Sequence, residues 1–119
     1  MAKKIIVVED EQVITEMIRF MLENEDYDVA AFNTNAGVIA QLQNEPAVLV
    51  LLDLALGAQD GLNICEHIKA SESLKHIPVV LMSAHRDLEK IAGECDADGF
   101  IVKPFELSAF AKKIKSFIN

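Results

Sequence analysis

The chain has 119 residues, 51% of them hydrophobic and 25% charged, which is the composition of a single globular domain spanning residues 1–119. Its 19 acidic and 11 basic side chains give a net charge of −8, with no clustered basic stripe, so the chain is poorly suited to direct nucleic-acid binding. No apolar run approaches the length of a membrane span and no signal peptide is evident, so we expect a cytoplasmic protein without a membrane segment.

The two cysteines and three histidines are scattered along the chain. Cys65 and Cys95 share no CxxC spacing, and neither has a histidine at zinc-ligand spacing. We therefore expect two reduced thiols packed in or near helices. Each histidine is expected to be a surface or packing residue.

Strand-like apolar runs alternate with apolar residues at helical spacing along the whole chain. The predicted strands cover roughly residues 4–9, 29–32, 48–52, 78–82 and 100–102. The predicted helices carry apolar stripes within residues 13–22, 38–42, 62–68, 88–92 and 107–117. Thr34 is expected to cap the second helix, and Asp60-Gly61 to open the third. Asn44-Glu45-Pro46 is expected to break the chain before the third strand.

Strict alternation of five strands with five helices predicts a doubly wound α/β sandwich around a parallel sheet. Right-handed crossovers leave two common strand orders, of which 2-1-3-4-5 suits five strands. In that order the direction of winding reverses between the first and third strands, and ligands bind beyond the carboxyl ends of strands at such a point.

Four of the predicted strands end at chemically capable residues. The first runs into Glu9-Asp10, the third into Asp53, the fourth into Ser83, and the fifth into Lys103-Pro104. Taken singly, each is typical of a cap or a turn. Together they place three carboxylates, a hydroxyl and an ammonium at one edge of the sheet, which predicts a catalytic or switch site.

Three neighbouring carboxylates require either a proton or a cation to offset their charge. Oxygen donors without cysteine or histidine favour a hard cation, and an incomplete protein shell suits Mg²⁺. With Lys103 added, the site is suited to a phosphoryl dianion that accepts a hydrogen bond from Ser83. Asp53 is then the candidate nucleophile, which would form an aspartyl phosphate.

The segments VVEDE, LVLLDLALGAQDGL, IPVVLMSA and GFIVKPF, in this order, closely resemble the receiver domain of two-component response regulators. The resemblance covers essentially the whole chain and implies the flavodoxin-like (βα)5 sandwich. It implies that Asp53 is phosphorylated by a phosphohistidine on a sensor histidine kinase or histidine phosphotransfer protein. It also implies that Asp10, Asp53 and the Ala55 carbonyl bind Mg²⁺, with Glu9 acting mostly through water.

The same resemblance assigns roles to residues near the end of the chain. Ser83 and Lys103 would hold the phosphoryl oxygens, and Phe100 matches the aromatic residue that moves when Ser83 moves. Ala55 and His85 occupy positions that tune dephosphorylation. The Lys103-Pro104 bond is commonly cis in the family. Phosphorylation would then alter a target-docking surface formed by the fourth helix, fifth strand and fifth helix.

Three features depart from the family pattern. Gly57 replaces the usual proline, so the loop after the third strand is expected to be more flexible. The segment between Ser83 and Lys103 is slightly short, which leaves the length of the fourth helix open. Phe100 lacks the hydroxyl of the commoner tyrosine, so switching here would depend on packing.

Two other functions fit an α/β chain of this kind. An aspartate-nucleophile phosphatase would carry a second aspartate at position 55, where this chain has alanine. A flavodoxin-like cofactor module needs a loop rich in hydroxyls and glycine after the first strand, where this chain has Glu9-Asp10-Glu11. A degenerate receiver that only binds proteins is disfavoured because each key position carries suitable chemistry. We therefore predict a phosphoacceptor signalling domain rather than an enzyme with external substrates.

Overall fold

A computed structural model of the protein describes residues 3–54 and 58–118. The sheet contains strands β1 (Lys3–Val8), β2 (Tyr27–Phe32), β3 (Leu49–Asp53), β4 (Val79–Ser83) and β5 (Gly99–Val102). The helices are α1 (Gln12–Asn24), α2 (Val38–Asn44), α3 (Ala58–Ala70), α4 (Leu88–Glu94) and α5 (Leu107–Ile118). All strand pairs are parallel and their order is β2-β1-β3-β4-β5, which confirms the predicted flavodoxin-like fold.

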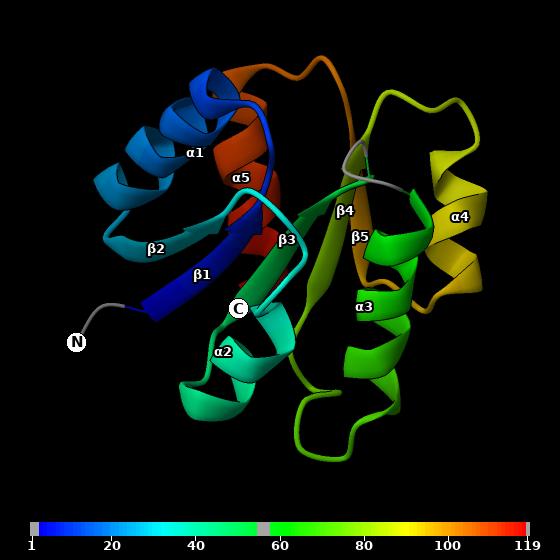
Figure 1. Ribbon diagram of the computed structural model, residues 1–119. Coiled ribbons are helices and arrows are strands. Elements are labelled where there is room, and N and C mark those ends of the chain that lie inside the picture. The colour runs from blue at the N-terminus through cyan, green and yellow to red at the C-terminus, as the bar shows by residue number, and fades with distance from the viewer. Residues whose placement is uncertain (1–2, 55–57, 119) are drawn as a thin grey trace.

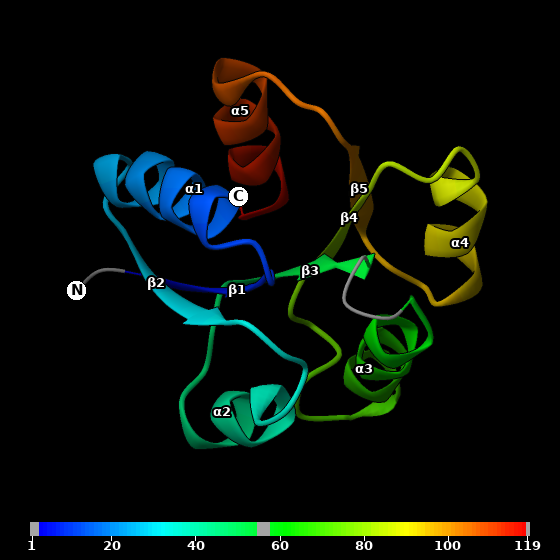
Figure 2. The same ribbon diagram turned by 45° about the horizontal axis from the view of Figure 1, so that its top comes forward.

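The helices form a layer on each face of the sheet (Figures 1 and 2). Helices α1 and α5 cover one face, and α2, α3 and α4 cover the other. Ile5 and Val7 of β1 pack on the α1–α5 face. Ile6 and Val8 pack on the opposite face, because successive strand side chains point to opposite sides. Apart from their polar ends, the central strands are therefore apolar at successive positions, which explains the continuous runs in the sequence.

The strand register brings the polar strand ends to one edge. Val8 pairs with Leu52, Asp53 pairs with Met82, and Ser83 pairs with Val102. The backbone N–H of Lys103 donates to the Ser83 carbonyl oxygen at 2.9 Å, so the β4–β5 ladder continues beyond β5. The prediction that these strand ends share one edge of the sheet, with the winding reversal between β1 and β3, is therefore confirmed.

The start of α2 differs from the prediction. Helix α2 begins at Val38 with Gly37 as its N-cap, and Gly37 has a φ of +83° that favours glycine. The Thr34 hydroxyl instead accepts a hydrogen bond from the Ala36 N–H at 3.3 Å. The predicted Thr34 cap was wrong because the hydroxyl closes a local turn before the helix.

Helix α3 also starts earlier than predicted. It begins at Ala58, so Asp60-Gly61 lies within the helix instead of opening it. A Cβ atom at Gly61 would lie 2.9 Å from Leu54 Cδ2. Glycine at this position therefore permits the close approach of α3 to the end of β3.

Helix α5 packs its last turn onto β5. The Phe117 ring occupies the space that a Cβ atom would need at Gly99, so the end of α5 packs closely on the edge strand. Among the described residues, no helix has the length and apolar character that crossing a membrane would require.

Candidate functional site at the carboxyl edge of the sheet

Three carboxylates meet where β1 and β3 end. Glu9 follows β1 and Asp53 ends β3, and each is only 1% exposed, whereas Asp10 is exposed. One ligand oxygen from each of these three residues lies within 4.8 Å of the others. The structure thus brings together the three acids that the sequence analysis singled out.

Lys103 supplies the positive charge at this cluster. Its ammonium nitrogen lies 3.0 Å from Glu9 Oε1 and 3.1 Å from Asp53 Oδ2. Burial alone lowers the pKa of Lys103, but the Glu9 and Asp53 carboxylates outweigh burial and raise its pKa above the usual value. The lysine therefore stays charged between the two buried acids. The Lys103-Pro104 bond is cis, as the family resemblance implied.

One lysine does not offset the three acids. Burial and then the neighbouring Asp53 side chain raise the pKa of Glu9 to about 7, against the opposing effects of Lys103 and the Glu11 amide. The donor set consists of carboxylate oxygens, two of the three acids being buried. Both the excess negative charge and the hard oxygen donors fit a divalent cation.

Ser83 lies beside Lys103 on the neighbouring strand. Its side chain is half-buried, and its hydroxyl oxygen accepts a hydrogen bond from the His85 N–H at 3.0 Å. His85 is exposed, and its Nδ1 accepts a hydrogen bond from the Asp87 N–H at 3.1 Å. The hydroxyl thus closes the turn that follows β4. It does not cap the following helix, the role expected of the serine taken alone, because the N-cap of α4 is Asp87.

Phe100 lies on β5, two residues before the strand ends. Its half-buried ring packs against the cluster that includes α4 residues Leu88 and Ala92. The Lys113 ammonium on α5 lies 5.1 Å from the ring centroid, within the range of a cation–π contact. The ring therefore packs in the core on the α2–α3–α4 side of the sheet and contacts Lys113 of α5. Ala55 and Gly57, the other predicted positions, lie outside the described residues.

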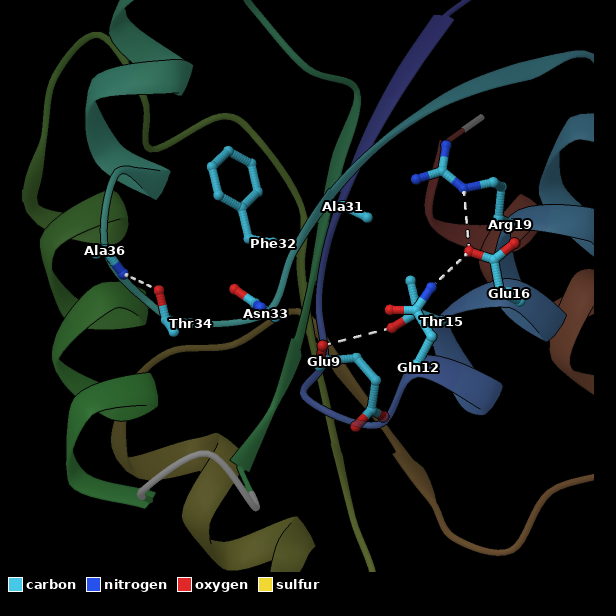
Figure 3. Close-up of a pocket in the computed structure, with 10 residues that line it drawn as sticks. All are labelled: Glu9, Gln12, Thr15, Glu16, Arg19, Ala31, Phe32, Asn33, Thr34 and Ala36. Atoms are coloured by element: carbon cyan, nitrogen blue, oxygen red, sulfur yellow. Dashed lines mark hydrogen bonds and ion pairs between the residues drawn. The ribbon is translucent and has the colours of Figure 1, made fainter.

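Thr15 is a supporting residue that the sequence analysis missed. It is 7% exposed, and its hydroxyl donates to the Glu9 carbonyl oxygen at 3.4 Å. Figure 3 shows this contact at one wall of a polar pocket of about 470 Å³ between α1 and the segment that follows β2. The only signal in the sequence is a threonine between the apolar residues Ile14 and Ile18 of α1.

The sequence of the chain matches a known family. Residues 5–115 match the family model described as the response regulator receiver domain. The chain belongs to this family. Since the match covers nearly the whole chain, the acid cluster and Lys103 lie within the receiver domain rather than in an added segment.

Solved structures resemble this receiver over its whole length. The signal receiver domain of a signal transduction histidine kinase from Syntrophus aciditrophicus is 27% identical, with a TM-score of 0.88 over 98% of this chain and 90% of that chain. The phosphorylated cyanobacterial phytochrome response regulator RcpA is 29% identical, with a TM-score of 0.83 over 99% and 94%. The Mn²⁺-bound response regulator Rcp1 is 26% identical, with a TM-score of 0.77 over 96% and 90%.

Proposed function

We propose that this receiver is a phosphorylation-dependent signalling switch in which Asp53 accepts a phosphoryl group. The donor would be a phosphohistidine on a sensor histidine kinase or a histidine phosphotransfer protein. The observation that best supports this proposal is the position of the Asp53 carboxylate. It is buried at the end of β3, within the acid cluster and 3.1 Å from the Lys103 ammonium. The similar regulator RcpA has been obtained in a phosphorylated form, which supports the proposal.

The acceptor step needs charge compensation as well as a nucleophile. An Asp53 carboxylate oxygen forms the bond to phosphorus while the bond from phosphorus to the donor imidazole nitrogen breaks. Lys103 already contacts Asp53, so its ammonium is placed to bind a phosphoryl oxygen as charge develops. Mg²⁺ held by Glu9, Asp10, Asp53 and the Ala55 carbonyl would neutralise phosphoryl charge when bound. The Mn²⁺-bound form of Rcp1 supports a divalent cation.

Ser83 would report phosphorylation to the neighbouring strand. Its hydroxyl oxygen accepts the His85 N–H, and its own O–H could donate to a phosphoryl oxygen on Asp53. Phe100 would then change its packing between α4 and Lys113 of α5. The surface formed by α4, β5 and α5 would thereby change its affinity for a downstream target or output domain. Ala55 and His85 would tune the return to the unphosphorylated state by controlling access of water.

The phosphodonor protein needs a docking surface beside the buried nucleophile. Among the described residues, four of the five exposed large hydrophobic side chains line one groove of about 440 Å³ between α1 and the start of α5. These residues are Val13, Met17, Phe20 and Leu107.

The groove is continuous with the site. Met17 also lines an adjoining hollow whose wall includes Lys103, Pro104 and Phe105. Since Asp53 is 1% exposed, a phosphohistidine reaches it only if the donor protein covers this edge of the sheet. We infer that an apolar helical face of the phosphodonor occupies this groove and contacts Val13, Met17, Phe20 and Leu107.

A phosphorylation assay tests the proposal. The chain incubated with acetyl phosphate and Mg²⁺ should gain one labile phosphoryl group, and Asp53→Asn should abolish the gain. Asp28→Asn is the matched control, because Asp28 is an exposed residue on β2 away from the site. Undiminished labelling of Asp53→Asn would exclude Asp53 as the acceptor. Multiple-turnover hydrolysis of a small phosphate ester would instead favour the phosphatase alternative.

A further inference from the structure

The fold brings the two cysteines of the chain together. Cys65 lies on α3 and Cys95 is the residue at which α4 ends, 30 positions later in the sequence. The Cys65 thiol donates a hydrogen bond to the Cys95 carbonyl oxygen at 3.3 Å. Both residues are buried, with exposed fractions of 0% and 3%. The Cys65 sulfur therefore lies against the Cys95 backbone. Because a cysteine side chain has only one carbon between backbone and sulfur, the Cys95 sulfur stays close to this backbone.

The Cys95 thiol, in turn, donates a hydrogen bond to the Ala92 carbonyl oxygen at 3.7 Å, so both thiols lie at the end of α4. Burial, and then a side-chain hydrogen bond with Cys95, raise the pKa of the Cys65 thiol well above its usual value. Lys69 opposes this effect only in part. Cys65 is therefore protonated at neutral pH, so the first attack on an oxidant is assigned to Cys95, and Cys65 must give up its proton when it reacts.

Cys95 borders a space that solvent can enter. Cys95 lines a polar pocket of about 290 Å³ between α3 and the end of α4, together with Glu66, Lys69, Glu94 and Asp96. A water molecule takes about 30 Å³ in the liquid, so this volume can admit a small hydroperoxide. Cys65 is absent from the pocket wall and is fully buried behind it.

We propose that Cys65 and Cys95 form a reversible intramolecular disulfide when a hydroperoxide oxidises the folded chain, which covalently joins α3 to α4. This inference is independent of the proposed phosphorylation of Asp53. Its consequence concerns α4, which has only seven residues and belongs to the proposed α4–β5–α5 target surface. A covalent tie at its last turn would restrict its movement relative to α3.

The oxidation proceeds in two balanced steps. The Cys95 sulfur, after losing its proton, attacks one oxygen of hydrogen peroxide, and the O–O bond breaks; the sulfur becomes a sulfenic acid, and the leaving hydroxide takes up the released proton to give water. The Cys65 sulfur then attacks the Cys95 sulfur and displaces the hydroxyl group, which leaves as water with the Cys65 thiol proton. Two thiols are oxidised and one peroxide is reduced to two waters. A dithiol reductant reverses the change by thiol–disulfide exchange.

The test treats the folded, full-length Asp53→Asn protein with hydrogen peroxide, so that phosphorylation plays no part. We expect the intact mass to fall by two hydrogen atoms per chain and both thiols to be lost in a titration performed after denaturation. Dithiothreitol should restore both. The closed loop between the cysteines should raise the melting temperature by about 10 °C relative to the reduced protein.

Single variants identify the order of attack. Cys65→Ser should stop at a Cys95 sulfenic acid that dimedone traps, whereas Cys95→Ser should leave the buried Cys65 thiol unmodified. Two free thiols after treatment of the folded chain would overturn the proposal. Disulfide formation only in denaturant, or only between chains, would overturn it equally. These outcomes are measured on the unsubstituted cysteine pair, so a variant that fails to fold does not obscure the result.

Discussion

The apolar groove on α1 gives the prediction that separates docking from chemistry most clearly. Val13 and Phe20 are 71% and 69% exposed in the free protein, so replacing each with serine removes little packing within the domain. Serine also has a helix propensity close to those of valine and phenylalanine, so α1 should keep its stability within about 0.5 kcal/mol. Val13→Ser and Phe20→Ser should therefore leave the acceptor site intact.

The expected loss in donor binding follows from the area that these side chains offer. A phenylalanine side chain presents about 200 Å², so at 69% exposure Phe20 offers a partner roughly 140 Å². At about 25 cal/mol per Å² this area sets a ceiling near 3.5 kcal/mol for full burial. Truncation of interface residues usually realises less, about 1–2 kcal/mol, because association carries its own costs. Each variant should thus weaken donor binding roughly 5- to 30-fold.

The assay compares two phosphodonors on the same variants. The first is the autophosphorylated sensor kinase that labels the unsubstituted chain fastest among those of the source organism, and the second is acetyl phosphate with Mg²⁺. We expect kinase-dependent labelling at subsaturating receiver to fall 5- to 30-fold by the estimate above, while acetyl phosphate labelling stays unchanged. Val102→Ser is the control, because Val102 is 50% exposed on β5 and lies outside the groove. Unchanged transfer from the kinase, or an equal loss with both donors, would refute the docking argument.

Three further predictions concern the site and the core. Lys103→Met removes the ammonium 3.1 Å from its aspartate partner, so acetyl phosphate labelling should fall at least about 10-fold. In the same variant, urea unfolding without Mg²⁺ should show a loss of about 3 kcal/mol if two buried carboxylates lose their counter-charge, and no loss would contradict that pairing. Millimolar Mg²⁺ should raise the melting temperature of the unsubstituted chain. Asp10→Asn should reduce this rise and Asp28→Asn should not, whereas equal rises would place the cation elsewhere. Gly99→Ala should destabilise the domain by about 1–3 kcal/mol because the new Cβ displaces the Phe117 ring, and adding Phe117→Leu should recover part of the loss.

The central strands were predictable because burial on both faces requires apolar residues at successive positions. Ile5, Ile6, Val7 and Val8 are each 0% exposed, so β1 appears in the sequence as an uninterrupted apolar run. Strand order then followed from the number of strands and the handedness of crossovers. The position of Asp53 at the site followed in turn, because parallel strands end at a common edge.

Local signals failed where a contact distant in sequence decides the outcome. Thr34 has the chemistry of a cap, but its hydroxyl closes a turn and Gly37 takes the cap position. Gly61 looked like the opening of a helix, yet it lies inside α3 where that helix approaches Leu54. A glycine signals that a side chain is absent, and the sequence does not state which neighbour fills the space.

The supporting contacts of the site were hidden for the same reason. Nothing in the spacing of Thr15 relates it to the Glu9 carbonyl, which the turn between β1 and α1 brings within 3.4 Å. Cys65 and Cys95 are 30 positions apart on different helices, so their contact depends on how α3 and α4 pack on the sheet. The strand ends predicted to meet do lie at one edge of the sheet, whereas the contacts of each side chain depend on three-dimensional packing.

The position of the phosphoryl group is the most direct test of the central claim that Asp53 is the acceptor. The chain is phosphorylated with acetyl phosphate and Mg²⁺, and the acyl phosphate is reduced with borohydride, which converts a phosphorylated aspartate to homoserine. Peptide sequencing by mass spectrometry then locates the altered residue. We predict homoserine at position 53 and unaltered aspartate at position 10. Homoserine elsewhere, or a phosphorylated chain with Asp53 unaltered, would contradict the proposed switch.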